Sequence, residues 1–260
     1  MMSMLDRSIS ELEPVWVWGL PLLPVTLEQS LDLIDKLIER RQPSYIVTPN
    51  LNYAMLTERR PELREVNAKA AFMVADGMPL VKQSRRMGTP LPCRVTGSDL
   101  IWKLFERAAQ RGHRIYLLGG APGVADEAAR RMCEKHPGLQ IVGIESPPFR
   151  DLSPDEQKEQ QERIRAAKAD ILIVSFGQPK GELWVARHYA TLEVPFNVQL
   201  GASIDFVAGK VYRAPHWVQR IGMEWFFRMA QEPRRLMGRY IRNAWFLLRM
   251  RVTRPQHRPE

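Results

Sequence analysis

The stretch FMVADGMPLV, residues 72–81, places one carboxylate, Asp76, at the end of an apolar run. A carboxylate at the end of a buried strand can act as a general base, because it can accept the proton of an attacking hydroxyl group. The pair Asp76-Gly77 is also a strong turn signal, since both residue types tolerate the tight backbone of a turn. The stretch by itself leaves both interpretations open.

Polar side chains follow a second apolar run. After YIV at residues 45–47 come Thr48, Asn50 and Asn52, whose hydroxyl and amide groups can contact a sugar or a nucleobase. Asn is also a common helix N-cap, so a purely structural role fits these residues as well.

The loop CRVTGSDL combines Arg94 with Thr96 and Gly97. A guanidinium group binds phosphate oxygens through charge-assisted hydrogen bonds, which makes Arg94 a candidate phosphate ligand. The alternative is a plain loop that leads into a helix capped by Ser98 or Asp99.

The stretch YLLGGAPGVADEAA contains Gly119 and Gly120 between an apolar run and a helix-like segment. Backbone N–H groups at such a turn can bind a phosphate, aided by the dipole of the following helix. The spacing matches neither GxGxxG nor GxxxxGK[ST], which argues against a dinucleotide site or a P-loop. A tight strand-to-helix turn explains the stretch equally well.

The stretch SFGQPKGELW places Gln178, Lys180 and Glu182 around a Pro-Gly loop after another apolar run. These side chains can bind a polar substrate, or the stretch can begin a helix with Glu182 in its first turn, where the helix dipole favours an acid. Gly201 and Asp205 follow the last apolar run of the same region and complete the set of candidate substrate ligands.

Nothing in the sequence predicts a metal site or a bound cofactor. The two cysteines form no CxxC pair, which fits a reducing compartment, and the five histidines are scattered without an HExxH motif. The chain also lacks a D-x-D motif, in which paired carboxylates hold Mg²⁺ or Mn²⁺ on a sugar nucleotide. We therefore expect Arg, Lys and helix N-termini to neutralise any pyrophosphate.

The elements that must position these residues alternate along the chain between strand-like apolar runs and amphipathic helical stretches. The expected strands are 45–50, 71–77, 114–120, 139–145, 170–177 and 196–201, and the expected helices are 27–41, 98–112, 121–138 and 153–169. This alternation predicts an α/β fold with a Rossmann-like, mostly parallel sheet flanked by helices. Such sheets bind ligands where their strands end, which is where the candidate residues lie.

Charge divides the chain into two parts. Residues 1–206 carry equal numbers of basic and acidic side chains, whereas residues 207–260 hold 12 Lys/Arg against three Asp/Glu, the whole net charge of +9. The sequence therefore predicts a catalytic α/β body over 1–206 and a basic, aromatic helical appendage over 207–260. The partner of the appendage is expected to be anionic, such as lipid headgroups, pyrophosphate or nucleic acid.

From residue 221 onward the appendage has apolar and aromatic residues at helical spacing, with arginines on much of the remaining surface. This pattern is typical of a helix that lies at a membrane interface. A helix that covers the core and exposes an arginine face is an alternative, and a nucleic-acid binder would lack any recognisable motif. With no secretory signal and no apolar stretch of about 20 residues, the chain is expected to be cytoplasmic.

The motifs and their order resemble those of the TagA/WecG/CpsF family of bacterial glycosyltransferases, glycosyltransferase family 26. The resemblance covers residues 15–248 and rests on TPNLNYAML, ADGMPLV, RVTGSDL, LLGGAPGVADEAA, FGQPKGELW and GASIDFVAGKVYRAPHWVQRIGMEWFFRMAQEPRRLMGRY. It implies an inverting, metal-independent transfer of a sugar from a UDP-sugar to a sugar carried on undecaprenyl pyrophosphate. Family members act at the cytoplasmic membrane face in making teichoic acids, enterobacterial common antigen or exopolysaccharides.

The resemblance also implies roles for particular residues. Asp76 would be the general base, while Thr48, Asn50 and Arg94 would lie in the site. Arginines of the appendage would complete the site over the pyrophosphate of the acceptor; they are Arg213, Arg220, Arg228, Arg235 and Arg239. We therefore expect a peripheral protein on the inner face of the plasma membrane that binds an anionic membrane surface and no nucleic acid, with a homo-oligomer as an option.

One position departs from the family pattern. Family members typically read P-K-Q-E where this chain has PKGE, so Gly181 stands where a glutamine is expected. Gln178, three residues earlier, could substitute for that glutamine. The departure supports an alternative hypothesis, a catalytically weak scaffold that binds nucleotide or lipid. It also leaves the donor sugar open among N-acetylmannosamine, its uronic acid and glucose.

Overall fold

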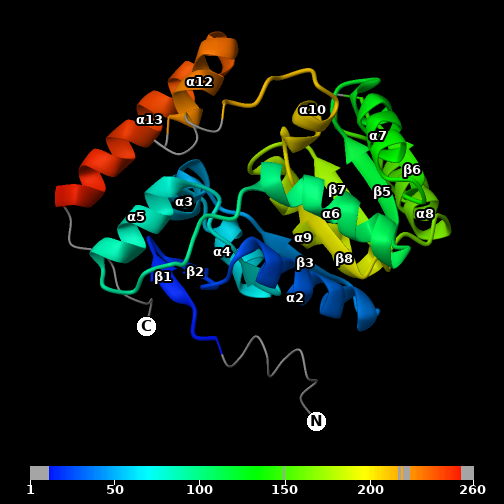
Figure 1. Cartoon of the computed structure of the whole chain (residues 1–260), viewed down its shortest axis with the longest axis horizontal. Coiled ribbons are helices and arrows are strands. Elements are labelled where there is room, and N and C mark those ends of the chain that lie inside the picture. The colour runs from blue at the N-terminus through cyan, green and yellow to red at the C-terminus, as the bar shows by residue number, and fades with distance from the viewer. Residues whose placement is uncertain (1–11, 149, 216–217, 219–222, 253–260) are drawn as a thin grey trace.

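The computed structural model describes residues 12–148, 150–215, 218 and 223–252, arranged around a central sheet (Figure 1). The strands of this sheet are β3 Ser44–Val47, β4 Phe72–Met73, β5 Arg114–Gly119, β6 Gln140–Glu145, β7 Ile171–Ser175 and β8 Phe196–Gln199. Their order is β4-β3-β8-β7-β5-β6, and every neighbouring pair is parallel. The predicted α/β fold with a mostly parallel sheet is confirmed.

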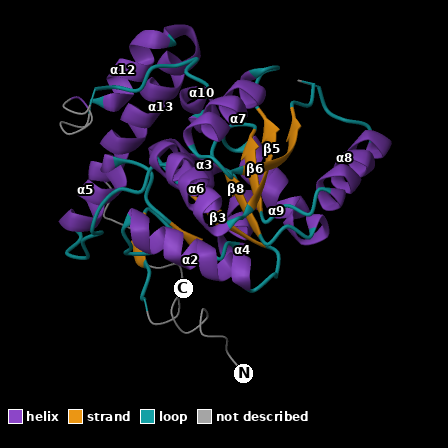
Figure 2. Ribbon diagram, turned by 45° about the vertical axis from the view of Figure 1, so that its right-hand side comes forward, coloured by secondary structure: helices purple, strands orange, loops and turns teal. Residues whose placement is uncertain are grey.

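Helices cover both faces of the sheet (Figure 2). One face carries α2 Leu27–Glu39, α6 Gly97–Arg111, α7 Val124–Lys135 and α10 Ser203–Val207. The other face carries α3 Leu51–Arg59, α4 Glu62–Lys69, α5 Met78–Arg86, α8 Pro154–Ala166 and α9 Lys180–Leu192, together with the antiparallel pair β1 Val15–Val17 and β2 Leu20–Leu22.

The two-sided cover explains why the strands are apolar throughout. Successive side chains of a strand point to opposite faces of the sheet. In β5, Ile115 and Leu117 belong to the core under α6 and α7, while Tyr116 and Leu118 belong to the core under α8 and α9. Because both faces are buried, both sets must be apolar, and the alternation of a half-exposed strand is absent.

The predicted strand at residues 71–77 is wrong in its length, since β4 covers two residues. Beyond β4 the chain still follows β3, with the Val74 N–H donating to the carbonyl of Val47 at 3.1 Å and the Asp76 N–H donating to the carbonyl of Pro49 at 2.8 Å. Pro49 has no N–H to donate in return, so the ladder cannot continue. Asp76 therefore lies in a loop beyond the strand.

The predicted cap of α6 is also wrong. Neither Ser98 nor Asp99 caps this helix; its N-cap is Thr96, whose hydroxyl accepts a hydrogen bond from the Asp99 N–H at 3.0 Å. Gly112 ends the helix in the left-handed conformation, φ +72°, which glycine adopts without strain.

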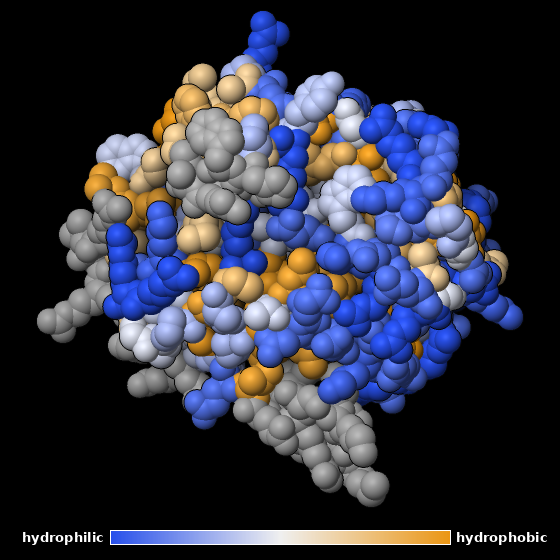
Figure 3. All heavy atoms as spheres, viewed as in Figure 1, coloured by the Kyte–Doolittle hydropathy of each residue, from blue (hydrophilic) through white to orange (hydrophobic). Residues whose placement is uncertain are grey.

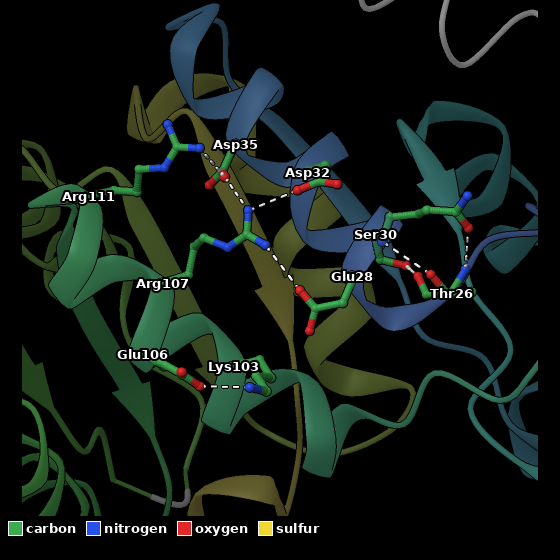
Figure 4. Close-up of polar contacts among 10 residues, drawn as sticks. Thr26, Glu28, Ser30, Asp32, Asp35, Lys103, Glu106, Arg107 and Arg111 are labelled. Carbon is green, nitrogen blue, oxygen red and sulfur yellow. Dashed lines mark hydrogen bonds and ion pairs between the residues drawn. The ribbon is translucent and has the colours of Figure 1, made fainter.

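Helix α6 is held against α2 by a group of ion pairs (Figure 4). Arg107 contacts Glu28 at 3.2 Å, Asp32 at 2.9 Å and Asp35 at 2.7 Å. Burial would raise the pKa of Asp35, but the neighbouring His113, the hydrogen bond from Arg107 and the charges of Arg107 and Arg111 lower it. The pairs fix the position of α6, whose first turn borders the functional site described below.

The appendage forms α12 Glu224–Gln231 and α13 Pro233–Val252 (orange to red in Figure 1). Helix α13 lies beside α3 and α5, and α12 packs against α13. Leu236 and Phe246 of α13 are buried, and the ring of Phe246 packs edge-on against Trp18 at 5.5 Å. Within the described ranges, no helix has an apolar stretch long enough to span a bilayer. The division of the chain at residue 206/207 falls inside α10 and stays a prediction.

Candidate active site

A cavity of about 650 Å³ lies at the C-terminal ends of the neighbouring strands β4, β3, β8 and β7, with α12 and α13 contributing the opposite wall. Its size is typical of a small-molecule site. The fold brings most of the predicted site residues to its lining, namely Thr48, Asn50, Asn52, Asp76, Gly77, Arg94, Thr96, Gly97, Gln178, Glu182, Gly201, Arg228 and Arg239.

Several predicted residues lie elsewhere. Gly119 ends β5, one strand beyond the cavity, and Gly120 follows it. A Cβ on Gly119 would lie 2.9 Å from the ring of Phe176, so this glycine permits close packing. Lys180 pairs at 3.7 Å with exposed Asp151. Asp205 in α10 and Arg213 next to the cavity are not among its lining residues. Arg235 belongs to α13, and the position of its side chain lies outside the described part of the structure. Arg220 falls outside the described residues.

Asp76 lies in the cavity wall with its carboxylate close to the start of α6. The Gly97 N–H donates to one carboxylate oxygen at 3.4 Å. Burial raises the pKa of Asp76 to about 6; the Gly97 hydrogen bond and the charges of Arg228 and Arg94 oppose this shift, and the carboxylate of Glu224 adds to it. The group is therefore ionised at neutral pH and far more basic than an ordinary aspartate, as a general base requires.

Gly77 follows Asp76 with φ +139°, a conformation that L side chains rarely adopt. This backbone turn starts α5 directly after Asp76. The turn interpretation and the catalytic interpretation are thus compatible, because the turn aims the carboxylate at the cavity.

Arg94 connects the body to the appendage. Its guanidinium pairs with Glu224 of α12 at 3.0 Å, and Glu224 also accepts from Arg213 at 3.4 Å. Arg213 in turn contacts Asp99 of α6 at 2.6 Å. All but Asp99 are about four-fifths buried, and Arg94 and Glu224 of this group line the cavity near Asp76.

The side chains after β3 combine structural and cavity positions. Asn50 caps α3 by accepting from the Tyr53 N–H at 3.1 Å, as the structural alternative predicts, and it also lines the cavity. Asn52 donates to the side-chain oxygen of Gln178 at 3.4 Å, which joins the first turn of α3 to the loop after β7. Thr48 is 6% exposed in the same wall.

Glu182 is a further carboxylate of the cavity, besides Asp76 and Glu224. It lies in the first turn of α9, as the helix interpretation predicts, and it is 4% exposed. Burial raises its pKa to about 7, against the opposing effects of its backbone hydrogen bond, Gln178 and Arg239. Its Oε2 atom has no hydrogen-bond partner among the described residues, so it is available to a donor group of a ligand.

No group of three or more His, Cys, Asp or Glu side chains that could hold a metal ion occurs in the described part of the chain. The positive charges in the cavity wall come instead from Arg94, Arg228 and Arg239.

Residues 15–259 match the glycosyl transferase family WecG/TagA/CpsF, over both the body and the appendage. The chain belongs to this family. A relative from Bacillus spizizenii (strain ATCC 23059 / NRRL B-14472 / W23), named N-acetylglucosaminyldiphosphoundecaprenol N-acetyl-beta-D-mannosaminyltransferase, is 29% identical over 76% of this chain and 75% of its own. A protein of the same name from Bacillus subtilis (strain 168) is 25% identical over 84% of this chain and 83% of its own.

Several cavity residues of this WecG/TagA/CpsF member have no signal in the sequence. Gln199 lies in β8, and its position next to Gly181 appears only in three dimensions. Asn243, Trp225 and Tyr240 come from α12 and α13. Asn243 is 5% exposed, and its Oδ1 atom has no partner among the described residues. The helical spacing of the appendage indicates a helix but does not say which of its residues reach the site.

Proposed function

We propose that the chain is an inverting, metal-independent glycosyltransferase. It would transfer an N-acetylmannosamine-type sugar or a related hexose from a UDP-sugar to a sugar linked to undecaprenyl diphosphate, in the synthesis of a cell-surface polysaccharide. Family membership and the names of the relatives support the acceptor class and the transferred sugar. The observation that carries the proposal is the cavity that holds basic Asp76 together with three arginines.

In the proposed step the acceptor hydroxyl attacks the anomeric carbon of the donor from the face opposite to UDP. Asp76 takes the hydroxyl proton as the new C–O bond forms, and the bond to UDP breaks with its electron pair moving onto the leaving phosphate. One attack from the opposite face inverts the configuration at the anomeric carbon. Atoms and charge balance without another reactant.

Charge develops on the leaving UDP during this step. Arginines fixed in a cavity stabilise such charge strongly, because they need no reorganisation at the moment of reaction. Arg94 and Arg228 lie close enough to Asp76 to lower its pKa, so they would place positive charge near the reacting atoms. The charge of Arg239 likewise lowers the pKa of Glu182. Arg239 and Glu182 would contact a part of the substrate that lies farther from Asp76.

Metal removal tests the metal-free part of the proposal. We expect UDP release to stay within about twofold when EDTA is added, because arginines supply the positive charge that a bound divalent ion would otherwise supply. The measurement is initial rate with excess EDTA and, as the control, with Mn²⁺ or Mg²⁺ added back. A rate that requires the added metal would contradict the metal-free mechanism.

The appendage is proposed to dock on an anionic membrane surface, which would make the protein peripheral on the inner face of the plasma membrane. All eight large hydrophobic side chains exposed among the described residues belong to the appendage: Tyr212, Met223, Trp225, Phe226, Met237, Ile241, Trp245 and Leu248. Figure 3 shows hydrophobic surface where Figure 1 places α12 and α13, against a mainly hydrophilic surface over α7 and α8. Arginines on the same helices suit anionic headgroups.

Substituting two of these side chains tests the docking. Ile241→Ser with Trp245→Ser should weaken binding to anionic vesicles at least tenfold, because each side chain would lose up to about 2 kcal/mol of apolar burial. Both are more than half exposed, so the fold should stay intact. The measurement is co-sedimentation with vesicles containing phosphatidylglycerol, with neutral vesicles as the control. Unchanged co-sedimentation would contradict the docking surface.

A catalytically weak scaffold that binds nucleotide or lipid is the second candidate function, suggested by Gly181. The deciding experiment measures UDP release with a panel of UDP-sugars and a short-chain polyprenyl-diphosphate-linked N-acetylglucosamine. Release that depends on the acceptor supports the transferase. Binding of UDP without turnover for any donor would support the scaffold. Self-association stays a prediction that the same preparation can test by its mass in solution.

A further inference from the structure

Position 181 requires glycine because a larger side chain would have no space there, and not because of the backbone conformation. It is the second residue of α9, and its φ is not among the positive values of the chain. Such a backbone accepts any L-residue, and alanine would favour the helix over glycine. A Cβ built on Gly181, however, would lie less than 3.0 Å from the Cγ, Cδ and Oε1 atoms of Gln199. The two positions compete for the same space.

Gln199 cannot move aside without losing hydrogen bonds, because its side-chain amide is bonded to the backbone and the residue is only 5% exposed. In the orientation that satisfies both ends of the amide, it donates to the Val174 carbonyl at 2.6 Å. Its oxygen then accepts from the N–H groups of Gly177 at 2.9 Å and Gly201 at 3.3 Å. The opposite orientation offers its oxygen the N–H of Phe176 at 3.3 Å. Either way, the amide binds the end of β7 to β8.

The segment that Gln199 holds carries part of the cavity wall. Gly177 and Gln178 follow β7, and Glu182 lies in the first turn of α9; all three line the cavity, as does Gln199 itself. The Gly181 N–H also donates to the Gly177 carbonyl at 2.8 Å, so this segment is a tight turn closed around the Gln199 side chain.

We propose that Gln199 is a positioning residue for the substrate cavity, which fills the place that a side chain at position 181 would occupy. The glutamine that the family pattern leads one to expect at 181 is then replaced by a glutamine that enters the same space from β8. The consequence for substrate affinity rests on the proposed function, whereas the competition for space does not. The glycine at position 181 therefore does not indicate that the site has lost its activity.

The competition for space predicts that Gly181→Ala changes Tm in opposite directions in the presence and in the absence of the Gln199 side chain. Gly181→Ala should lower the Tm of the full chain, because it displaces Gln199 from its hydrogen bonds. In a Gln199→Ala background the same change should leave Tm unchanged or raise it, since only the helix preference for alanine remains. Gly238→Ala in α13 is the matched control, because its Cβ meets nothing closer than 3.7 Å. Additive changes in Tm, or a higher Tm for Gly181→Ala alone, would overturn the proposal.

The positioning role predicts a change in substrate affinity. Gln199→Ala should raise the KM for the UDP-sugar about tenfold and change kcat less, because the cavity wall loosens while Asp76 is untouched. The exchange Gly181→Gln with Gln199→Gly should restore KM to within about threefold. The control is Gln160→Ala, a buried glutamine bonded to Glu145 outside the cavity, which should lower Tm without changing KM.

A KM that is unchanged in Gln199→Ala, or an exchange that fails to restore it, would overturn the positioning role. If the wild-type chain itself shows no turnover, the proposed function fails. The Tm comparison then still decides whether Gln199 and Gly181 compete, because it needs no substrate.

Discussion

Replacing Asp76 by asparagine should lower kcat at least a hundredfold and leave the fold intact. A hundredfold loss corresponds to about 2.7 kcal/mol of transition-state stabilisation, within the range expected when a general base is removed. Asparagine keeps the shape of the side chain and can keep a contact with the Gly97 N–H, but it cannot accept the proton. The measurement is acceptor-dependent UDP release at saturating donor.

Stability should change in the opposite direction to activity. The pKa of Asp76 in the folded chain, about 6, lies above its ordinary value of 3.8. Folding thus favours the protonated carboxyl, and the stability from this group is lost as pH rises through about 6. At pH 8 the Tm of Asp76→Asn should therefore equal or exceed that of the wild type, with a smaller difference at pH 5.

The matched control for this substitution is Asp126→Asn, which changes an exposed aspartate in the first turn of α7, away from the cavity. Its rate should stay within about twofold of the wild type. Asp76→Asn with a rate within tenfold of the wild type would return Asp76 to the role of a turn residue. The search for the base would then move to Glu182, the other carboxylate of the cavity with a raised pKa.

Replacing Arg94 by glutamine should lower kcat/KM about a hundredfold and move the acidic side of the pH–rate profile to higher pH. The first effect follows because a fixed donor to a developing anion contributes about 3 kcal/mol in comparable sites. The second follows because the charge of Arg94 lowers the pKa of Asp76, so its removal makes the base harder to ionise. The measurement is kcat/KM between pH 5 and 9.

Glu224→Gln is the matched control, since Glu224 raises the pKa of Asp76 where Arg94 lowers it. The acidic side of its profile should move to lower pH. It also releases Arg94 from the ion pair across the cavity, so its rate should fall less than that of Arg94→Gln. A shift of both profiles in the same direction would show that Asp76 is not the group that limits the rate at low pH.

The fold could be predicted because its strands are buried on both faces. Apolar runs such as RIYLLG and DILIVS stand out in a sequence when both faces must be apolar, and amphipathic helices between them imply a parallel sheet. The elements that were missed are short or weakly periodic. The pair β1–β2 has three residues in each strand, and α4 has eight residues, too few for a clear helical repeat.

The site could be predicted in part, because residues that follow parallel strands converge at one edge of the sheet. Asp76, Thr48 and Gln178 come from three such positions and line one cavity. The same rule wrongly predicted Gly119 as a site residue, because Gly119 also ends a strand. There the neighbouring Phe176 ring fills the space above the glycine, and a sequence gives no measure of that space.

The sequence by itself determined the fold class, the family, the position of the excess charge and part of the residues that line the cavity. These depend on local periodicity and on the order of motifs, both of which can be read from the linear sequence. The tertiary structure decided which strand ends open into the cavity and which are filled. It also decided that Glu224 pairs with Arg94 next to Asp76, and that Gln199 takes the space beside Gly181. These contacts join residues far apart in the chain, and their energies depend on distance and burial, which only the folded chain defines.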